Sequence, residues 1–344
     1  MVKTLVIWAH SACRSNAALF AEVRKLAEAR GIVTRICLWN ERPLPSGRLG
    51  ALNDTVTVGE DQSRGMSVLR ANGGPDSVQV FCVYQNSPVW RRLIVEAKRG
   101  GARVVVNAEA PCEMCLGPLA ALKRLYYRWI LPRRVRAAVA AADLFLSASG
   151  EAGVDRLERL GWRREQIVPF GYASPRLREF AAGRVERSEG GPLWILHLGS
   201  EAPVRDVRTL ERAMKVLRNR GVMAELARTA GALTESDLVA AIRRADVVVG
   251  CGLCEPWGMR INDALLEGTP VVVSDGMGAC SLCATYDCGR VFRRGDARSL
   301  ADALTAAADP SVLSRWRAGA ARAAEELLPE RRASFWLKTV LGGN

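Results

Sequence analysis

One stretch of the chain, residues 247–275, carries side chains whose types and spacing could bind a phosphorylated ligand. It reads VVVGCGLCEPWGMRINDALLEGTPVVVSD. Glu255 and Asp263 stand about two helical turns apart, so a helix would place both carboxylates on one face. Gly258 lies between them, and a glycine lets the backbone approach a ligand closely. Amide groups at the start of the following helix could hold an anion.

Two short valine-rich runs must position these groups. Val247–Gly250 and Val271–Ser274 are typical of buried strands in a parallel sheet, and a helix-length segment separates them. Strand, turn, helix and strand make one βαβ unit. Because ligands of open parallel sheets bind outside the carboxyl ends of the strands, this pattern predicts Glu255 at the ligand edge.

Three groups of residues in this stretch carry a resemblance to a known family. They are Glu255-Pro256-Trp257-Gly258, Asp263-Ala264 and the run 267–275, EGTPVVVSD. Together they resemble the nucleotide-sugar site of the retaining GT-B glycosyltransferases of family 4, whose pattern has two glutamates separated by seven residues and Pro-Phe-Gly after the first. Asp263 stands at the second glutamate and keeps the carboxylate. The alternative is an unrelated nucleotide-binding α/β unit without transferase activity.

The resemblance implies the GT-B fold, an α/β architecture in which two Rossmann-like domains with parallel sheets face a central cleft. We expect an acceptor-side domain over residues 1–183, a linker over 184–191, a nucleotide-sugar domain over 192–328 and a final helix over 329–344 that packs back on the first domain. The linker prediction also rests on the residues themselves, because 183–191 is polar, contains glycine and has no apolar face.

The same resemblance assigns roles in donor binding. Glu255 would contact the transferred sugar, and Asp263 would hydrogen-bond the ribose. Arg205 falls where the family has a lysine, and Ser200 falls where the family has an arginine. A guanidinium pairs with phosphate in a bidentate manner, so Arg205 could bind the diphosphate. Arg208 could replace the charge of the missing arginine. The full set of expected donor-binding residues is Gly199, Ser200, Arg205, Pro256, Trp257, Gly258, Met259 and Asp263.

Glu109 is the catalytic candidate of the first half, beside Glu255 and Arg205 of the second. It follows the predicted strand 103–107 at its carboxyl end, where a carboxylate could meet the acceptor hydroxyl or the transferred sugar. Similar transferases carry an acid or a histidine there. The alternative is a carboxylate that caps a helix. His10 and Arg14, in a turn that is not glycine-rich as the family's often is, are further candidates for acceptor contacts.

By resemblance, the reaction moves a hexosyl group from a nucleoside diphosphate to a hydroxyl of a glycan, with retention of configuration. No metal or cofactor is expected. Arg205 and backbone amides would stabilise the departing diphosphate. The acceptor is expected to be a growing surface glycan, such as lipopolysaccharide or another polysaccharide, often linked to lipid. A nucleotide-sugar epimerase with the GT-B fold and a non-catalytic partner subunit remain the two alternatives.

The chain is strongly basic. It has 344 residues, of which 49 are Lys or Arg and 36 are Asp or Glu, a net charge of +13. Basic surfaces attract nucleic acid, anionic lipid or phosphorylated molecules. Nucleic acid is not expected, because aromatic residues are interleaved with the charges only around residues 116–142.

The segment 116–142 combines helical apolar spacing with positive charge. Basic amphipathic helices that carry aromatic residues lie on anionic membrane surfaces, so we expect peripheral contact with a membrane. The alternative is a helix packed in the core with a solvated basic face. No signal peptide and no membrane-spanning run of about 20 apolar residues is visible, which predicts a cytoplasmic protein on the inner face of the membrane. The apolar residues are Leu119, Leu122, Leu125, Tyr126, Trp129 and Ile130, and the basic ones are Lys123, Arg124, Arg128, Arg133, Arg134 and Arg136.

The ten cysteines include three Cys-x-x-Cys pairs, at 112/115, 251/254 and 280/283. The last two pairs follow strands that should be neighbours, so Cys251, Cys254, Cys280 and Cys283 could bind zinc. A metal there would crowd Glu255, and buried reduced thiols are the favoured interpretation.

Overall fold

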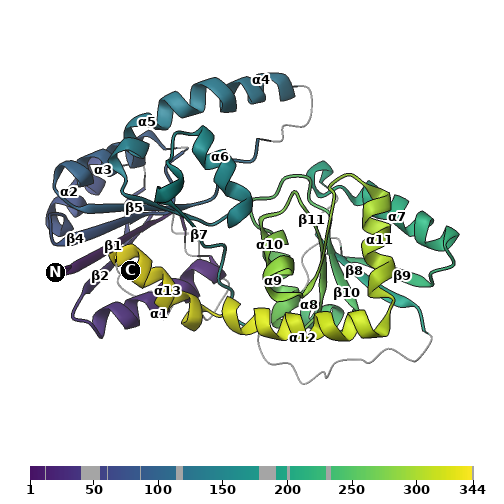
Figure 1. Cartoon of the computed structure of the whole chain (residues 1–344). Coiled ribbons are helices and arrows are strands. Elements are labelled where there is room, and N and C mark those ends of the chain that lie inside the picture. The colour runs from purple at the N-terminus through teal and green to yellow at the C-terminus, as the bar shows by residue number, and fades with distance from the viewer. Residues whose placement is uncertain are drawn as a thin grey trace. The chain divides into compact units, whose positions relative to one another are not determined.

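The computed structural model describes residues 1–11, 13–39, 55–59, 61–85, 87–113, 119–177, 191–199, 202–229 and 234–342. The chain divides into two units (Figure 1). Unit 1 comprises Met1–Glu113, Leu119–Pro175 and Pro329–Asn344, and unit 2 comprises Met114–Pro118 and Arg176–Leu328. The predicted linker 184–191 lies outside the described residues except for Gly191.

Unit 1 is built on a parallel sheet of seven strands in the order β3-β2-β1-β4-β5-β6-β7. The central strands are apolar on both faces, as expected of a parallel sheet that helices cover on both sides. The strands are β1 Thr4–Ala9, β2 Val33–Leu38, β3 Thr55–Thr57, β4 Ser77–Phe81, β5 Arg103–Ala108, β6 Leu144–Ser147 and β7 Ile167–Pro169.

The helices of unit 1 cover the two faces of this sheet, as Figure 1 shows. One core cluster joins the sheet to α2, α3, α5 and α6, and the other joins it to α1 and α13. Trp336 of α13 is fully buried against Phe20 and donates a hydrogen bond from Nε1 to Asn107 Oδ1 at 2.9 Å. The helices are α1 Arg14–Glu28, α2 Gln62–Asn72, α3 Pro88–Arg99, α4 Ala120–Leu125, α5 Leu131–Ala141, α6 Val154–Arg159 and α13 Pro329–Leu341.

Unit 2 has a parallel sheet of five strands in the order β12-β11-β10-β8-β9. Its core joins β8, β10 and β11 to α7 and α11. The strands are β8 Leu193–Leu198, β9 Ala224–Thr229, β10 Val247–Gly250, β11 Val271–Ser274 and β12 Gly289–Phe292. The helices are α7 Val207–Asn219, α8 Glu235–Arg244, α9 Met259–Leu266, α10 Ser281–Tyr286, α11 Ala297–Ala307 and α12 Pro310–Leu327.

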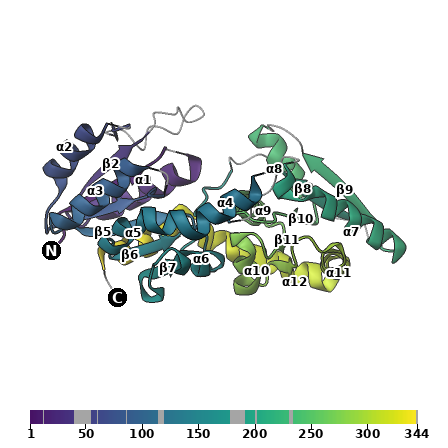
Figure 2. The same cartoon turned by 90° about the horizontal axis from the view of Figure 1, so that it is seen from above.

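The predicted α/β class with two Rossmann-like parallel sheets is confirmed. Helix boundaries differ in two places. Helix α12 begins at Pro310, earlier than the start at Arg315 that apolar spacing predicts, because the Asp309 side chain accepts hydrogen bonds from the amides of Ser311 and Val312. Within the segment 116–142, whose residues are described from 119 on, α4 and α5 are joined by a π-helical turn, Tyr126–Ile130, in one continuous run (Figure 2). Apolar periodicity does not reveal such a turn.

Candidate functional site

The candidate site of unit 2 lies at the carboxyl ends of β8 and β10, where backbone hydrogen bonds tie separate segments together. The amide of Leu253 donates to the carbonyl of Val204 at 2.8 Å. The amide of Glu255 donates to the carbonyl of Gly276 at 2.9 Å, and Gly278 returns a bond to the Glu255 carbonyl at 3.2 Å. The main chain on both sides of Glu255 is therefore anchored, and the short 3₁₀ helix Pro203–Arg205 is held beside it.

Arg205 and Glu255 form an ion pair between Nη1 and Oε2. Their side chains are 35% and 17% exposed, so the pair is shielded but open to solvent on one side. The two residues stand fifty positions apart in the sequence. Unit 2 thus brings together a guanidinium and a carboxylate that the sequence placed at the donor site.

Gly258 turns the chain from this loop into α9. Its φ is +110°, a value that L side chains rarely adopt, and a Cβ there would lie 2.5 Å from Met277 Cε. The next residue, Met259, begins α9. The backbone conformation therefore favours glycine here, and any larger residue would also displace the end of the Met277 side chain.

Trp257 and Asp263 have roles in packing that the sequence did not show. Trp257 is 3% exposed and donates from Nε1 to Asn262 Oδ1 at 2.9 Å. Asp263 is 5% exposed, and its Oδ2 lies 3.1 Å from Arg260 Nη1. Arg260 lines the cavity of the site, whereas Asp263 is not among the lining residues. Pro256 and Met259 are half-buried beside them.

The cavity between these groups is small, about 20 Å³, which is room for about one water molecule. Its polar side chains are those of Arg205, Glu255, Arg260 and His197. Arg205 and Glu255 occupy the centre of the predicted site by binding each other. A nucleotide sugar could enter only if this pair separated.

His197 is a site residue that sequence reasoning passed over. It is 3% exposed, and its Nδ1 lies 3.1 Å from the Val249 carbonyl oxygen. Burial lowers the pKa of the imidazole, and the positive charges of Arg205 and Arg228 act in the same direction. The only signal in the sequence is a polar residue in the otherwise apolar strand LWILHL.

The turn after β8 is described in part. Gly199 follows the strand, and a Cβ on it would lie 3.8 Å from His197 Nε2. Ser200, predicted to contact the donor, lies outside the described residues. Arg208, the suggested substitute for the missing arginine, is exposed in the first turn of α7.

Glu109, the candidate of unit 1, follows β5. Its side chain is exposed, and its Oε1 accepts a hydrogen bond from the Tyr172 hydroxyl at 2.9 Å. Burial raises the pKa of the Tyr172 phenol well above its usual value, and the charge of Glu109 adds to this effect, so the phenol stays protonated and donates. No helix starts within the described residues 110–113, so Glu109 caps none there. No motif or spacing in the sequence identifies Tyr172 as a site residue.

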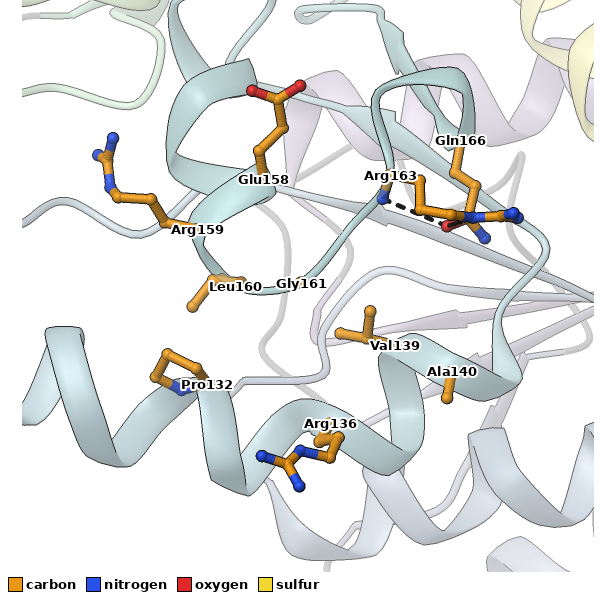
Figure 3. Close-up of a pocket in the computed structure, with 10 residues that line it drawn as sticks. All are labelled: Pro132, Arg136, Val139, Ala140, Glu158, Arg159, Leu160, Gly161, Arg163 and Gln166. Atoms are coloured by element: carbon orange, nitrogen blue, oxygen red, sulfur yellow. Dashed lines mark hydrogen bonds between the residues drawn. The ribbon is translucent and has the colours of Figure 1, made fainter.

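A wider hollow of about 470 Å³ lies between α5 and the turn from α6 to β7 (Figure 3). Three arginines line it. Arg159 pairs with Glu113 at 2.9 Å, and Arg163 donates to Gln166 Oε1 at 3.0 Å. None of the predicted site residues is among its lining residues, so we assign it no part in the chemistry.

The zinc hypothesis concerns Cys251, Cys254, Cys280 and Cys283, and it stays a hypothesis. Within the part of the chain that the structure describes, no three His, Cys, Asp or Glu side chains are grouped so that they could hold a metal ion. Cys251 and Cys283 are buried free thiols. Burial raises the pKa of the Cys251 thiol, which disfavours the thiolate that a metal would need.

Comparison with known proteins extends this picture. Residues 224–321 match the family model described as Glycosyl transferases group 1. Curated proteins give no significant match. The structure is similar to that of the lipopolysaccharide outer core galactosyltransferase WaaB, with a TM-score of 0.66, 10% identity and coverage of 98% of this chain and 99% of the other.

Two further solved structures are similar over nearly the whole length. Anabaena Alr3699/HepE in complex with UDP has a TM-score of 0.61 and 13% identity, covering 99% of this chain and 100% of the other. A glycosyltransferase from Rickettsia africae ESF-5 has a TM-score of 0.63 and 11% identity, with the same coverage. The chain therefore has the GT-B fold, and its second unit contains a segment that matches the group 1 glycosyltransferases.

Proposed function

We propose that the protein is a retaining glycosyltransferase of the family 4 type, which transfers a hexosyl group from a nucleoside diphosphate to a hydroxyl of a surface glycan. The observation that carries this proposal is the Arg205–Glu255 pair at the carboxyl edge of a parallel sheet, beside the turn that Gly258 makes into α9. The match of residues 224–321 to group 1 glycosyltransferases supports it, as does the GT-B fold that the chain shares with a protein crystallised with UDP.

The ion pair suggests how the donor is bound. A diphosphate carries more negative charge than a carboxylate and can engage a guanidinium through two oxygens. In our proposal the donor takes Arg205 from Glu255, and the released carboxylate then faces the sugar. On binding, Arg205 therefore pairs with the diphosphate, and Glu255 accepts hydrogen bonds from the hydroxyls of the sugar.

The proposed reaction uses this arrangement at the transition state. The acceptor oxygen forms a bond to the anomeric carbon as the bond from that carbon to the diphosphate breaks, on the same face of the sugar. The acceptor proton passes to the departing phosphate. Arg205 stabilises the negative charge that grows on the diphosphate, and Glu255 stabilises positive character at the anomeric carbon. Glu109, held by Tyr172, would orient the acceptor hydroxyl. This scheme needs no metal or cofactor.

Binding of a nucleoside diphosphate is the first expected result. We expect UDP, GDP or ADP, added at a hundred times its dissociation constant, to stabilise the protein by about 2.7 kcal/mol, seen as a higher melting temperature. The corresponding nucleotide sugar, offered with glycan acceptors, should yield a product that keeps the anomeric configuration. If none of these nucleotides binds, the proposal is wrong. If the sugar nucleotide is isomerised without an acceptor, the protein is an epimerase instead, and binding without any turnover would indicate a non-catalytic subunit.

We also propose that the continuous helical run 119–141 rests on an anionic membrane, where a lipid-linked acceptor would be reached from the cytoplasmic side. No residue of α4 or of the π-helical turn is buried. The side chains of Leu122, Leu125 and Trp129 are 63%, 54% and 52% exposed, so this apolar face does not pack into the core. The same run carries six basic residues and no acidic one. No described helix is long and apolar enough to cross a bilayer.

Vesicle binding tests the membrane proposal. We expect the protein to co-sediment with vesicles that contain anionic phosphatidylglycerol and not with neutral phosphatidylcholine, because each basic residue near an anionic surface contributes about 1 kcal/mol. Trp129→Glu should weaken binding at least tenfold. Met223→Glu is the matched control, since Met223 is an equally exposed apolar residue of unit 2, at 64%. Equal loss in both variants, or equal binding to both kinds of vesicle, would contradict the proposal.

A further inference from the structure

His197 carries a buried polar atom that no described residue satisfies. The residue lies on β8, two positions before Gly199, and lines the same cavity as Arg205 and Glu255. Its Nδ1 is bonded to the Val249 carbonyl, but Nε2 is buried without a hydrogen-bond partner among the described residues. Buried polar atoms are rarely left unpaired, so this one calls for an explanation.

The one bond that His197 makes determines what Nε2 can accept. A carbonyl oxygen is only an acceptor, so Nδ1 must carry the proton that is shared with Val249. In the neutral ring Nε2 then holds a lone pair and is itself an acceptor. Burial lowers the pKa of the imidazole, which keeps the ring in this neutral form.

The position of Nε2 shows where its partner would come from. A Cβ on Gly199 would lie 3.8 Å from this atom, so Nε2 faces the turn at the carboxyl end of β8. The atom itself is buried, so a ligand would have to reach it through the cavity that His197 lines. Arg205 and Glu255, the groups assigned to the diphosphate and the sugar, line the same cavity.

The chemistry of an acceptor excludes one class of contact and favours another. A lone pair on Nε2 repels phosphate oxygens, which are also acceptors. It can bind an O–H or N–H group, and a hydroxyl is the donor that ribose and hexoses present next to a diphosphate. We propose that His197 Nε2 accepts a hydrogen bond from a hydroxyl of the bound nucleotide sugar, and that His197 is therefore a residue that determines donor specificity.

This inference rests on the proposed function, and nitrogen NMR can test it directly because the chain has only two histidines. In the His10→Gln variant labelled with ¹⁵N-histidine, all the histidine signals come from His197. We expect the Nδ1–H tautomer without ligand. Saturating UDP-glucose or GDP-mannose, whichever binds, should shift the Nε2 signal towards that of a hydrogen-bonded nitrogen. The Nε2–H tautomer, or an Nε2 signal unchanged at saturation, would overturn the inference.

A double-mutant cycle supplies the functional measurement. His197→Leu removes the acceptor and should weaken donor binding about tenfold, the equivalent of one hydrogen bond. His197→Gln, whose side-chain oxygen can accept, should recover part of this loss. Deoxy analogues of the donor each lack one hydroxyl. Only one of them should bind the wild-type protein about tenfold more weakly than the complete donor does. The His197→Leu variant should bind that same analogue as tightly as it binds the complete donor.

The failures of the two proposals can be told apart. If the wild type binds no nucleoside diphosphate by calorimetry, the proposed function itself is wrong. If the wild type binds donor and His197→Leu binds it equally well, with an unchanged melting temperature, only the assignment of His197 fails. The assignment of His197 would also be rejected if the losses of affinity from His197→Leu and from each deoxy analogue were simply additive.

Discussion

Replacing Arg205 with alanine is expected to lower kcat/KM for the donor by about 10²–10³-fold, the effect of removing one group that stabilises charge in a transition state. The reason is that Arg205 is the cation held within reach of Glu255 at the proposed diphosphate position. Steady-state kinetics with the preferred nucleotide sugar would measure the effect. Arg205→Lys keeps the charge but loses the bidentate geometry, so an intermediate loss is expected.

The matched control for this substitution is Arg212→Ala. Arg212 is an exposed arginine of α7. Its replacement makes the same change in net charge without touching the site. Its kinetics should stay close to those of the wild type. Wild-type turnover by Arg205→Ala would show that Arg205 has no part in the mechanism. Equal losses of kcat/KM in both variants would show that the effect comes from overall charge.

Replacing Trp336 with alanine is expected to destabilise unit 1 by about 3–5 kcal/mol, the usual cost of removing a large aromatic side chain from a core. Trp336 is fully buried, packs against Phe20 and donates to Asn107. The substitution would leave a cavity beneath the sheet and an amide oxygen without its partner. Denaturant unfolding, followed by a probe placed in unit 1, would report the loss.

Phe335→Ala provides the comparison on the same helix. Phe335 is 46% exposed and stacks on Phe170 with ring centroids 6.2 Å apart, so its removal should cost about 0.5–1.5 kcal/mol. The large difference between these neighbours follows from the full burial of Trp336 and from its hydrogen bond to Asn107. If Trp336→Ala were no more harmful than Phe335→Ala, α13 would not be an integral part of the unit 1 core.

Much of the fold could be predicted because the relevant information is local. The buried strands of both sheets are short runs rich in Val, Ile and Leu, and in a parallel sheet such runs stand out from their polar turns. β10, the following loop, α9 and β11 form one contiguous unit, so the spacing of Glu255, Gly258 and Asp263 could be read directly. Helix starts were less certain. Asp309 caps α12 through hydrogen bonds that periodicity does not report.

The helical run of α4, the π-helical turn and α5 shows where local information ends. The sequence revealed an amphipathic basic helix, and both a core-packed and a surface position agreed with that pattern. Tyr126 and Tyr127 pack against the core, whereas Leu122, Leu125 and Trp129 are exposed. The π-helical turn helps to decide which side chains face inward, and such a turn depends on packing with neighbouring elements.

The two parallel sheets and the loop that carries Glu255 and Gly258 could be predicted from residue types and their spacing. The pairing of the site's side chains arises from the three-dimensional fold. Arg205 meets Glu255 across fifty residues, Tyr172 meets Glu109 across sixty-three, and His197 meets Val249 across fifty-two. These pairings depend on which strands are neighbours and on where each side chain points. A linear pattern records a residue's type and spacing, but a hydrogen bond depends on distance and direction in space.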